Sequence, residues 1–253
     1  MSFSPDWLAL RAPYDSAARA TGLEHRLGDW LEGRRSVSVV DLGAGSGNNL
    51  AHLAPRLAVD QRWTLVDADG ALLAAAARRH PGVTLRAGDL AGDLTALIPE
   101  GTDLVTASAL IDLVSQAWLA RLADRVREIG CALLVVLTYD GRIAWERETG
   151  QDAEIRDLVN RHQRGDKGFG AALGPDAPGA LSRLLPGVET ASSDWKVGPG
   201  ETAMRRALVD GWSGAAAEIA PERTESIAAW RAWASSEPRA LTVGHTDQLW
   251  LPG

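Results

Sequence analysis

A glycine-rich turn is the part of the sequence whose residue types point most clearly to ligand binding. Residues 39–48 read Val-Val-Asp-Leu-Gly-Ala-Gly-Ser-Gly-Asn, so a short β-branched run breaks into three alternating glycines. Glycine lets a ligand approach the backbone because no Cβ stands in the way. A helix that begins after such a turn also presents unpaired amides to an anionic group. The turn therefore predicts a site for the anionic part of a cofactor.

The spacing of the glycines and two further acids help to choose the cofactor. The dinucleotide fingerprint G-x-G-x-x-G, started at Gly43, would need glycine where the chain has Asn48. Asp67 ends the second predicted strand, where a carboxylate can accept both ribose hydroxyls in either class of cofactor. Asp89 follows the third predicted strand, where a turn cap is the alternative interpretation.

The pattern Asp41-x-Gly-x-Gly-x-Gly, with Asp67 and Asp89, resembles the Rossmann-like (class I) S-adenosylmethionine-dependent methyltransferases over about residues 37–140. The resemblance implies S-adenosylmethionine as cofactor, with its carboxylate at the glycine turn, its ribose on Asp67 and its adenine amino group on Asp89. Arg19, in a segment that resembles the family's helical lid, could pair with the same carboxylate, or it could be a solvated arginine. The cofactor residues predicted in this way are Arg19, Asp41, Gly43, Ala44, Gly45, Asn48, Asp67, Ala68, Gly88, Asp89, Leu90 and Ser108.

Candidates for the acceptor side follow the fourth and fifth predicted strands. Asp112 and Tyr139 lie where the resemblance places the methyl group, and His162 lies in a charged, glycine-rich stretch. We expect these three residues to be catalytic, in a pocket covered by Tyr14 and Arg19 on one side and residues 162–169 on the other. His162 has the most suitable intrinsic pKa for a base, and Asp112 is the alternative if burial raises its pKa. The competing interpretation is that Asp112 caps a helix and His162 faces solvent.

Several classes of partner are disfavoured by composition. The formal net charge of −7 argues against a nucleic-acid partner, and the nucleobase-methylase motifs are missing. The five histidines show no metal-ligand spacing. No apolar run is long enough for a bilayer, and the N-terminus does not read as a secretory signal. We therefore expect a cytoplasmic protein with a small-molecule acceptor, no metal and no membrane partner; the acceptor's identity, the atom methylated and the oligomeric state stay open.

The elements that must position these residues alternate between strand and helix. Such alternation predicts βαβ units and a parallel sheet. We expect an α/β, Rossmann-like, doubly wound, mostly parallel seven-stranded sheet with helical additions at both ends. The expected strands cover residues 37–42, 63–67, 83–87, 104–107, 131–138, 188–197 and 240–251, the last with a bulge. A single domain over residues 1–253 would then comprise a lid (1–34), a core (37–140), an accessory segment (142–187) and a C-terminal part (188–253).

Two alternatives to a methyltransferase remain at this point. An NAD(P)-dependent oxidoreductase is disfavoured by the glycine spacing and by the absence of a Tyr-x-x-x-Lys pair, since Ile143 lies four residues after Tyr139. A non-catalytic module that binds S-adenosylmethionine is compatible with the sequence, because the fold requires no particular catalytic group.

Overall fold

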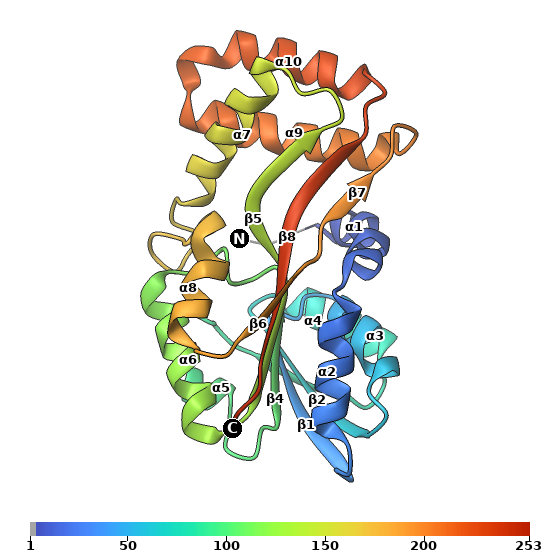
Figure 1. Cartoon of the computed structure of the whole chain (residues 1–253), viewed down its shortest axis with the longest axis vertical. Helices are drawn as coiled ribbons and strands as arrows, with labels where there is room; N and C mark the ends of the chain where they lie inside the picture. Colours follow the sequence, from blue (N-terminus) through green and yellow to red (C-terminus); the bar gives the residue numbers. More distant parts are fainter. Residues whose placement is uncertain (1–3) are drawn as a thin grey trace.

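A mostly parallel sheet forms the centre of the molecule, which the computed structural model describes over residues 4–253 (Figure 1). Its strands are β1 (Ser36–Leu42), β2 (Asp60–Asp67), β3 (Thr84–Ala87), β4 (Leu104–Ser108), β5 (Ala132–Trp145), β6 (Glu189–Ser192), β7 (Trp195–Val197) and β8 (Leu241–Trp250). The order is β3-β2-β1-β4-β5-β8-β6, with β7 paired to the other end of β8. The first five are parallel and β8 is antiparallel. This confirms the expected fold class, with β6 and β7 sharing the seventh place; residues 1–3 of the predicted lid lie outside the described residues.

Helices cover both faces of this sheet. They are α1 (Pro5–Ala18), α2 (Thr21–Leu31), α3 (Asn48–Leu53), α4 (Gly70–Arg79), α5 (Leu94–Leu97), α6 (Gln116–Ile129), α7 (Gly150–Gln163), α8 (Ala177–Leu184), α9 (Thr202–Ile219) and α10 (Thr224–Ser236). One hydrophobic cluster joins α2, α3 and α4 to the sheet, and a second joins α5, α6 and α8 to the opposite face. A third cluster holds α7, α9 and α10 as a cap around the ends of β5 and β8 (Figure 1). Within residues 4–253, no helix is both long and apolar enough to cross a membrane.

The helix α6 illustrates how local sequence sets these boundaries. The Ser115 side chain accepts a hydrogen bond from the backbone N–H of Trp118 and so caps the helix. Gly130 ends it in the left-handed conformation that glycine adopts without strain. Between these ends, Trp118, Leu122 and Val126 recur every four residues and are buried against the sheet.

The strand β5 continues past the point where the sequence predicted its end. The polar residues after Thr138 were expected to close the strand, but pairing with β8 extends to Trp145 through two register shifts. At the first shift, Leu137 adopts a positive φ of 56°, and its N–H donates to Asp247 Oδ1 at 2.7 Å. A buried carboxylate thus holds a left-handed residue that would otherwise be unfavourable. The bulge redirects the rest of β5 toward the cap.

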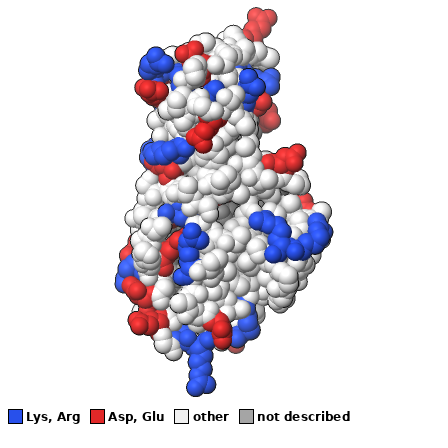
Figure 2. Space-filling view, turned by 90° about the vertical axis from the view of Figure 1, so that its right-hand side faces the viewer, with Lys and Arg blue, Asp and Glu red and all other residues white. Residues whose placement is uncertain are grey.

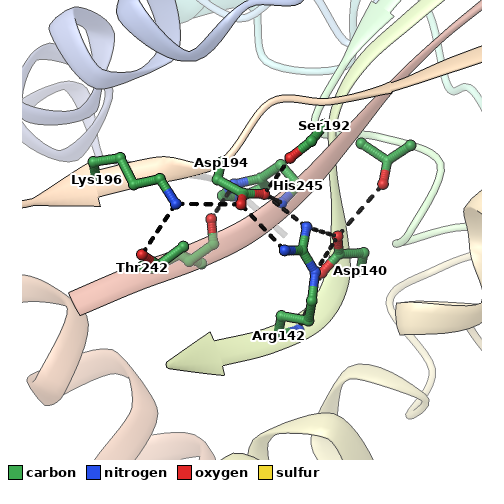
Figure 3. Close-up of polar contacts among 9 residues, drawn as sticks. Asp140, Arg142, Ser192, Asp194, Lys196, Thr242 and His245 are labelled. Atoms are coloured by element: carbon green, nitrogen blue, oxygen red, sulfur yellow. Dashed lines mark hydrogen bonds and ion pairs between the residues drawn. The ribbon is translucent and has the colours of Figure 1, made fainter. Parts of the chain in front are cut away.

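The predicted strand over residues 188–197 is split into β6 and β7. Asp194 lies at the break, where it accepts a hydrogen bond from Arg142 Nη2 at 2.7 Å, while Asp140 accepts one from Arg142 Nε at 3.0 Å (Figure 3). Arg142 therefore ties the second half of β5 to the segment between β6 and β7. Gly244 of β8 lies directly beneath this network, because a Cβ there would come within 2.6 Å of Arg142 Cβ.

A buried ion pair fixes the cap. Arg239 Nη1 lies 2.8 Å from Asp152 Oδ2, and its guanidinium sits between the rings of Trp145 and Trp233, at 4.1 and 4.2 Å from their centroids. Trp230 Nε1 donates to the same carboxylate. These contacts join α7 and α10 to the end of β5 and the start of β8. The strands β5 and β8 therefore run from the sheet into the cap.

We expect Gly244→Ala to lower the free energy of unfolding by about 1–3 kcal/mol, because the added methyl group overpacks the Asp140–Arg142 contact. The matched control is Gly214→Ala in α9, where a Cβ meets nothing within 4 Å and alanine favours the helix. Urea unfolding of both variants checks this prediction. Equal stability of the Gly244 variant and the wild type would show that β5 and β8 do not depend on this close approach.

Candidate functional site

The glycine turn connects β1 to α3 and has the conformation that its sequence suggests. Gly43, Gly45 and Gly47 all have positive φ angles, of 66°, 52° and 81°. A Cβ at Gly47 would come within 2.8 Å of the His80 ring, so this position also needs the small residue for space. The Gly45 N–H donates to Asp67 Oδ2 at 2.7 Å, which joins the turn to the end of β2.

The two predicted nucleoside-binding acids lie together at this edge. The backbone N–H of Gly88 donates to the Asp67 carbonyl at 3.0 Å, so the residue before Asp89 is bonded to Asp67. Asp89 Oδ1 also accepts from the Ala91 N–H, as expected of a turn cap. The structure therefore brings the glycine turn, Asp67 and Asp89 to the carboxyl ends of three adjacent strands, where open α/β sheets bind ligands.

Asp41 is buried completely and faces the interior. Its Oδ1 accepts a hydrogen bond from Asn49 Nδ2, which also donates to the Thr106 hydroxyl. Burial raises the pKa of Asp41 to about 7. Asn49 Oδ1 accepts in turn from Arg19 Nη1 at 2.8 Å. Asp41 thus fixes α3 against β1 and β4, and it can act on a ligand only by holding the turn; sequence reasoning did not identify Asn49, which carries this connection.

Arg19 lies at the corner between α1 and α2 and has partners within the protein. Its Nη2 lies 3.3 Å from Glu24 Oε1, and its Nε lies 3.7 Å from Asp247 Oδ2. Glu24 also contacts His52 Nε2 at 2.8 Å, and His52 Nδ1 lies 2.6 Å from the Ser16 hydroxyl. This buried network fastens the α1–α2 corner to α3 and β8. Arg19 would therefore have to share its charge between Glu24, Asp247 and the carboxylate of any ligand that it bound.

The helix α1 lies across the glycine turn. Asn48 Nδ2 donates to the Leu8 carbonyl at 3.1 Å, and a Cβ at Gly45 would meet Leu8 at 3.7 Å. The cavity left between α1 and the turn has a volume of only 60 Å³ and is lined by Arg11 and Ser108, among others. A groove of 920 Å³ opens beside it between α1 and α4 and reaches Asn48. The groove has the size of a cofactor site, and α1 covers part of the turn beside it. The residues at this edge therefore fit a nucleoside cofactor partly covered by α1.

Asp112 lies after β4, one strand away from the glycine turn. Asp112 is 6% exposed, and its Oδ1 has no hydrogen-bond partner within the described residues. Burial raises the pKa of Asp112 from 3.8 to about 7, although the nearby Arg11 guanidinium opposes this rise. Ala109, at the end of the same strand, has a positive φ of 50°. Strained backbone and a perturbed acid at one strand end are typical of functional sites.

Asp112 lies near Tyr139, from which a series of ring contacts leads to Trp195. Tyr139 of β5 is close enough for the Asp112 charge to contribute to the rise of its pKa, which is mainly caused by burial. The ring centroid of His245 lies 6.3 Å from Tyr139 and 4.6 Å from Trp195. Arg11 of α1 lies over Trp195, with its guanidinium carbon 5.0 Å from the ring centroid. We call Asp112, Arg11, Tyr139, Trp195 and His245 the Asp112 cluster; sequence reasoning missed His245, Trp195 and Arg11, which belong to no local motif.

His162 does not contact Asp112 or Tyr139 within the described part of the chain. Its Nε2 lies 2.9 Å from Glu218 of α9, and Lys167 lies within 3.3 Å of Nδ1. The expected cover over residues 162–169 also differs, because Phe169 packs against Trp118 with ring centroids 5.8 Å apart. This segment closes the side of the sheet near α6, and α1 is the element that covers the site.

The remaining predicted cofactor residues lie along the same edge of the sheet. Ser108 ends β4, and Ala68 follows Asp67 at the end of β2. Leu90 is buried, and its carbonyl accepts a hydrogen bond from Trp118 Nε1. Ala44 donates its N–H to the Val66 carbonyl at 3.0 Å.

A comparison with known protein families supports the resemblance seen in the sequence. Residues 39–130 match the family described as a methyltransferase domain. A comparison with curated protein sequences finds no match.

Solved structures that match include a Bacillus halodurans protein (13% identity, 89% of this chain and 96% of the other, TM-score 0.53). The YcgJ protein of Bacillus subtilis matches at 14% identity over 92% of this chain and 100% of the other, with a TM-score of 0.51. An S-adenosylmethionine-dependent methyltransferase from Thiobacillus denitrificans, solved with S-adenosylhomocysteine, matches at 17% identity over 99% and 100%, with a TM-score of 0.47. Residues 39–130 are therefore similar to a methyltransferase domain, and the sheet has the Rossmann-like fold of the class I S-adenosylmethionine-dependent methyltransferases.

Proposed function

We propose that the chain moves the methyl group of S-adenosylmethionine to a small molecule, and that Asp112 accepts a proton from this acceptor. The observation that carries the proposal is the position of Asp112. It is a buried carboxylate with an unpartnered oxygen, it follows the strand next to the glycine turn, and Arg11 of α1 is close enough to lower its pKa. A group with a raised pKa at this position is suited to proton transfer near neutral pH.

The cofactor would be held by groups that already lie at one edge. Asp67 would bind the ribose hydroxyls and Asp89 the adenine amino group, while the backbone amides of the turn face the carboxylate. Because Glu24 and Asp247 already share the charge of Arg19, we give Arg19 the smaller part in holding that carboxylate. The other residues of the proposed cofactor site are Asp41, Gly43, Ala44, Gly45, Asn48, Ala68, Gly88, Leu90 and Ser108.

When bound, S-adenosylmethionine supplies a methyl group that its positive sulfur has already activated. The chain then has to align the acceptor and exclude water, for which α1 is placed over the turn. Asp112 would take the proton that the acceptor loses. Tyr139 donates its hydroxyl to Asn160 Oδ1 at 2.8 Å, so its part in the proposal is to shape the site. The contacts of His162 with Glu218 favour Asp112 over His162 as the base.

A small acceptor is favoured by the cover and by the charge distribution. Asp112 is buried and Arg11 of α1 lies near it, so a bulky polymer could reach it only if the surrounding elements moved apart. Figure 2 shows basic and acidic side chains interspersed over one face of the molecule, without a continuous basic band. The net charge of −7 also disfavours a polyanionic acceptor. We therefore propose a small-molecule acceptor and no nucleic-acid partner.

We expect S-adenosylmethionine and S-adenosylhomocysteine to bind with micromolar Kd, and NAD and NADP not to bind in this range. Asp67→Ala and Asp89→Ala should each weaken binding by roughly tenfold to a hundredfold, because each removes a hydrogen bond to a charged group. Isothermal titration calorimetry with the four ligands measures both effects.

Asp93→Ala is the matched control, because Asp93 caps the next turn in the same way as Asp89 but lies further along the chain. Its affinity should equal that of the wild type. Tighter binding of a nicotinamide cofactor, or normal affinity in folded Asp67 and Asp89 variants, would contradict the proposed site.

We expect the stability gained from Asp112→Asn to grow as the pH rises from about 4 to 7. The folded-state pKa is raised to about 7 from 3.8, so over this range folded Asp112 holds a proton that the unfolded chain releases. The free energy of unfolding of the wild type therefore falls as pH rises, and asparagine removes this loss. Urea unfolding of both proteins at several pH values tests this, and parallel pH profiles would show that Asp112 titrates normally.

A further inference from the structure

The Asp112 carboxylate lacks a matching positive charge in the folded chain. Among the described residues, no side-chain nitrogen forms an ion pair with it, and its Oδ1 has no hydrogen-bond partner. A buried charge is costly unless it is paired and hydrogen-bonded. Asp112 must therefore either hold a proton or meet a cation that arrives from outside.

The nearest positive charge is already neutralised. Arg11 donates two hydrogen bonds to Asp15, from Nε at 2.9 Å and from Nη2 at 3.1 Å. The Trp195 Nε1 also donates to Asp15, so the pair is fixed against β7. A bidentate pair of this kind compensates both charges. Arg11 lowers the pKa of Asp112 but does not form an ion pair with it.

His245 adds no positive charge near the cluster. Burial lowers the pKa of His245 to about 3, so its ring is neutral at physiological pH. Its Nδ1 lies 3.1 Å from the Val243 carbonyl, which assigns the ring proton to Nδ1. Beyond it, Arg142 is shared between Asp140 and Asp194, and Lys196 approaches Asp194 (Figure 3). The surrounding ions compensate one another, and Asp112 remains unpaired.

The other three members of the Asp112 cluster are aromatic. Tyr139, Trp195 and the neutral His245 lie in edge-to-face or tilted contact. Aromatic faces attract cations, and they do so most strongly where water is excluded. An unpaired carboxylate near the Tyr139 ring therefore matches an organic ammonium ion better than a neutral hydroxyl or an anion.

We propose that the acceptor is an amine, bound at Asp112 as its ammonium ion; this rests on the proposed methyltransferase function. The ammonium gives one proton to the Asp112 carboxylate, which leaves a neutral amine with a free electron pair. That pair forms the new N–C bond while the C–S bond of the methyl donor breaks and its electron pair stays on sulfur. The product is a methylated ammonium ion, and Asp112 later releases its proton to water.

The test compares matched ligands that differ only in their polar group. Phenethylamine, 2-phenylethanol and 3-phenylpropionate, together with the corresponding butyl and indolylethyl series, are titrated calorimetrically into protein saturated with S-adenosylhomocysteine. We expect the amine of at least one series to bind at least tenfold more tightly than its alcohol and carboxylate. S-adenosylmethionine should then yield the N-methylated product of the same amine.

Asp112→Asn keeps the shape of the side chain and removes its charge, so it should weaken amine binding by roughly tenfold to a hundredfold. Asp124→Asn, which removes a surface charge from α6, is the control and should bind as the wild type does. Equal or weaker binding of all amines, or unchanged amine affinity in the Asp112 variant, overturns the proposal. Failure of S-adenosylhomocysteine itself to bind would instead refute the proposed function.

Discussion

The carboxylate of Asp247 joins the three parts of the chain whose relative positions define the site. It is 1% exposed, and its two oxygens accept from the Leu137 N–H at 2.7 Å and the Ala20 N–H at 3.0 Å. Arg19 brings a compensating charge to within 3.7 Å. Asp247 thus holds the bulge of β5, the start of α2 and the end of α1 together. A buried carboxylate of this kind tolerates little change, because loss of one partner leaves the others unsatisfied.

Two consequences of this constraint meet at Asp112. The bulge at Leu137 directs Tyr139 and the second half of β5 past the end of β4, and the fixed α1–α2 corner lays α1 over the glycine turn. Asp112 is buried nearby, and Arg11 of α1 lowers its pKa while remaining paired with Asp15. The packing that fixes the corner also places α1 over the turn, where only a small cavity remains.

The sequence predicted that the glycine turn, Asp67 and Asp89 share one edge of the sheet, because the signals for them are local. The glycine turn, Asp67 and Asp89 each follow directly from a strand, and parallel strands bring their carboxyl ends together. The extent of β5 and the role of His245 could not be predicted in this way. Both depend on the antiparallel strand β8, which returns about 100 residues later and pairs across a bulge. The pairing of His162 with Glu218 likewise depends on the cap, whose helices carry no recognisable motif.

A crystal structure of the protein with S-adenosylhomocysteine is the most direct test of this account. We predict that the adenosine lies along Asp67 and Asp89 and that the amino-acid end lies at the glycine turn. The sulfur should then face Asp112 and Tyr139, beneath a shifted α1. The account would be contradicted by a ligand that binds away from the carboxyl ends of β1, β2 and β4, or by a sulfur that points away from Asp112.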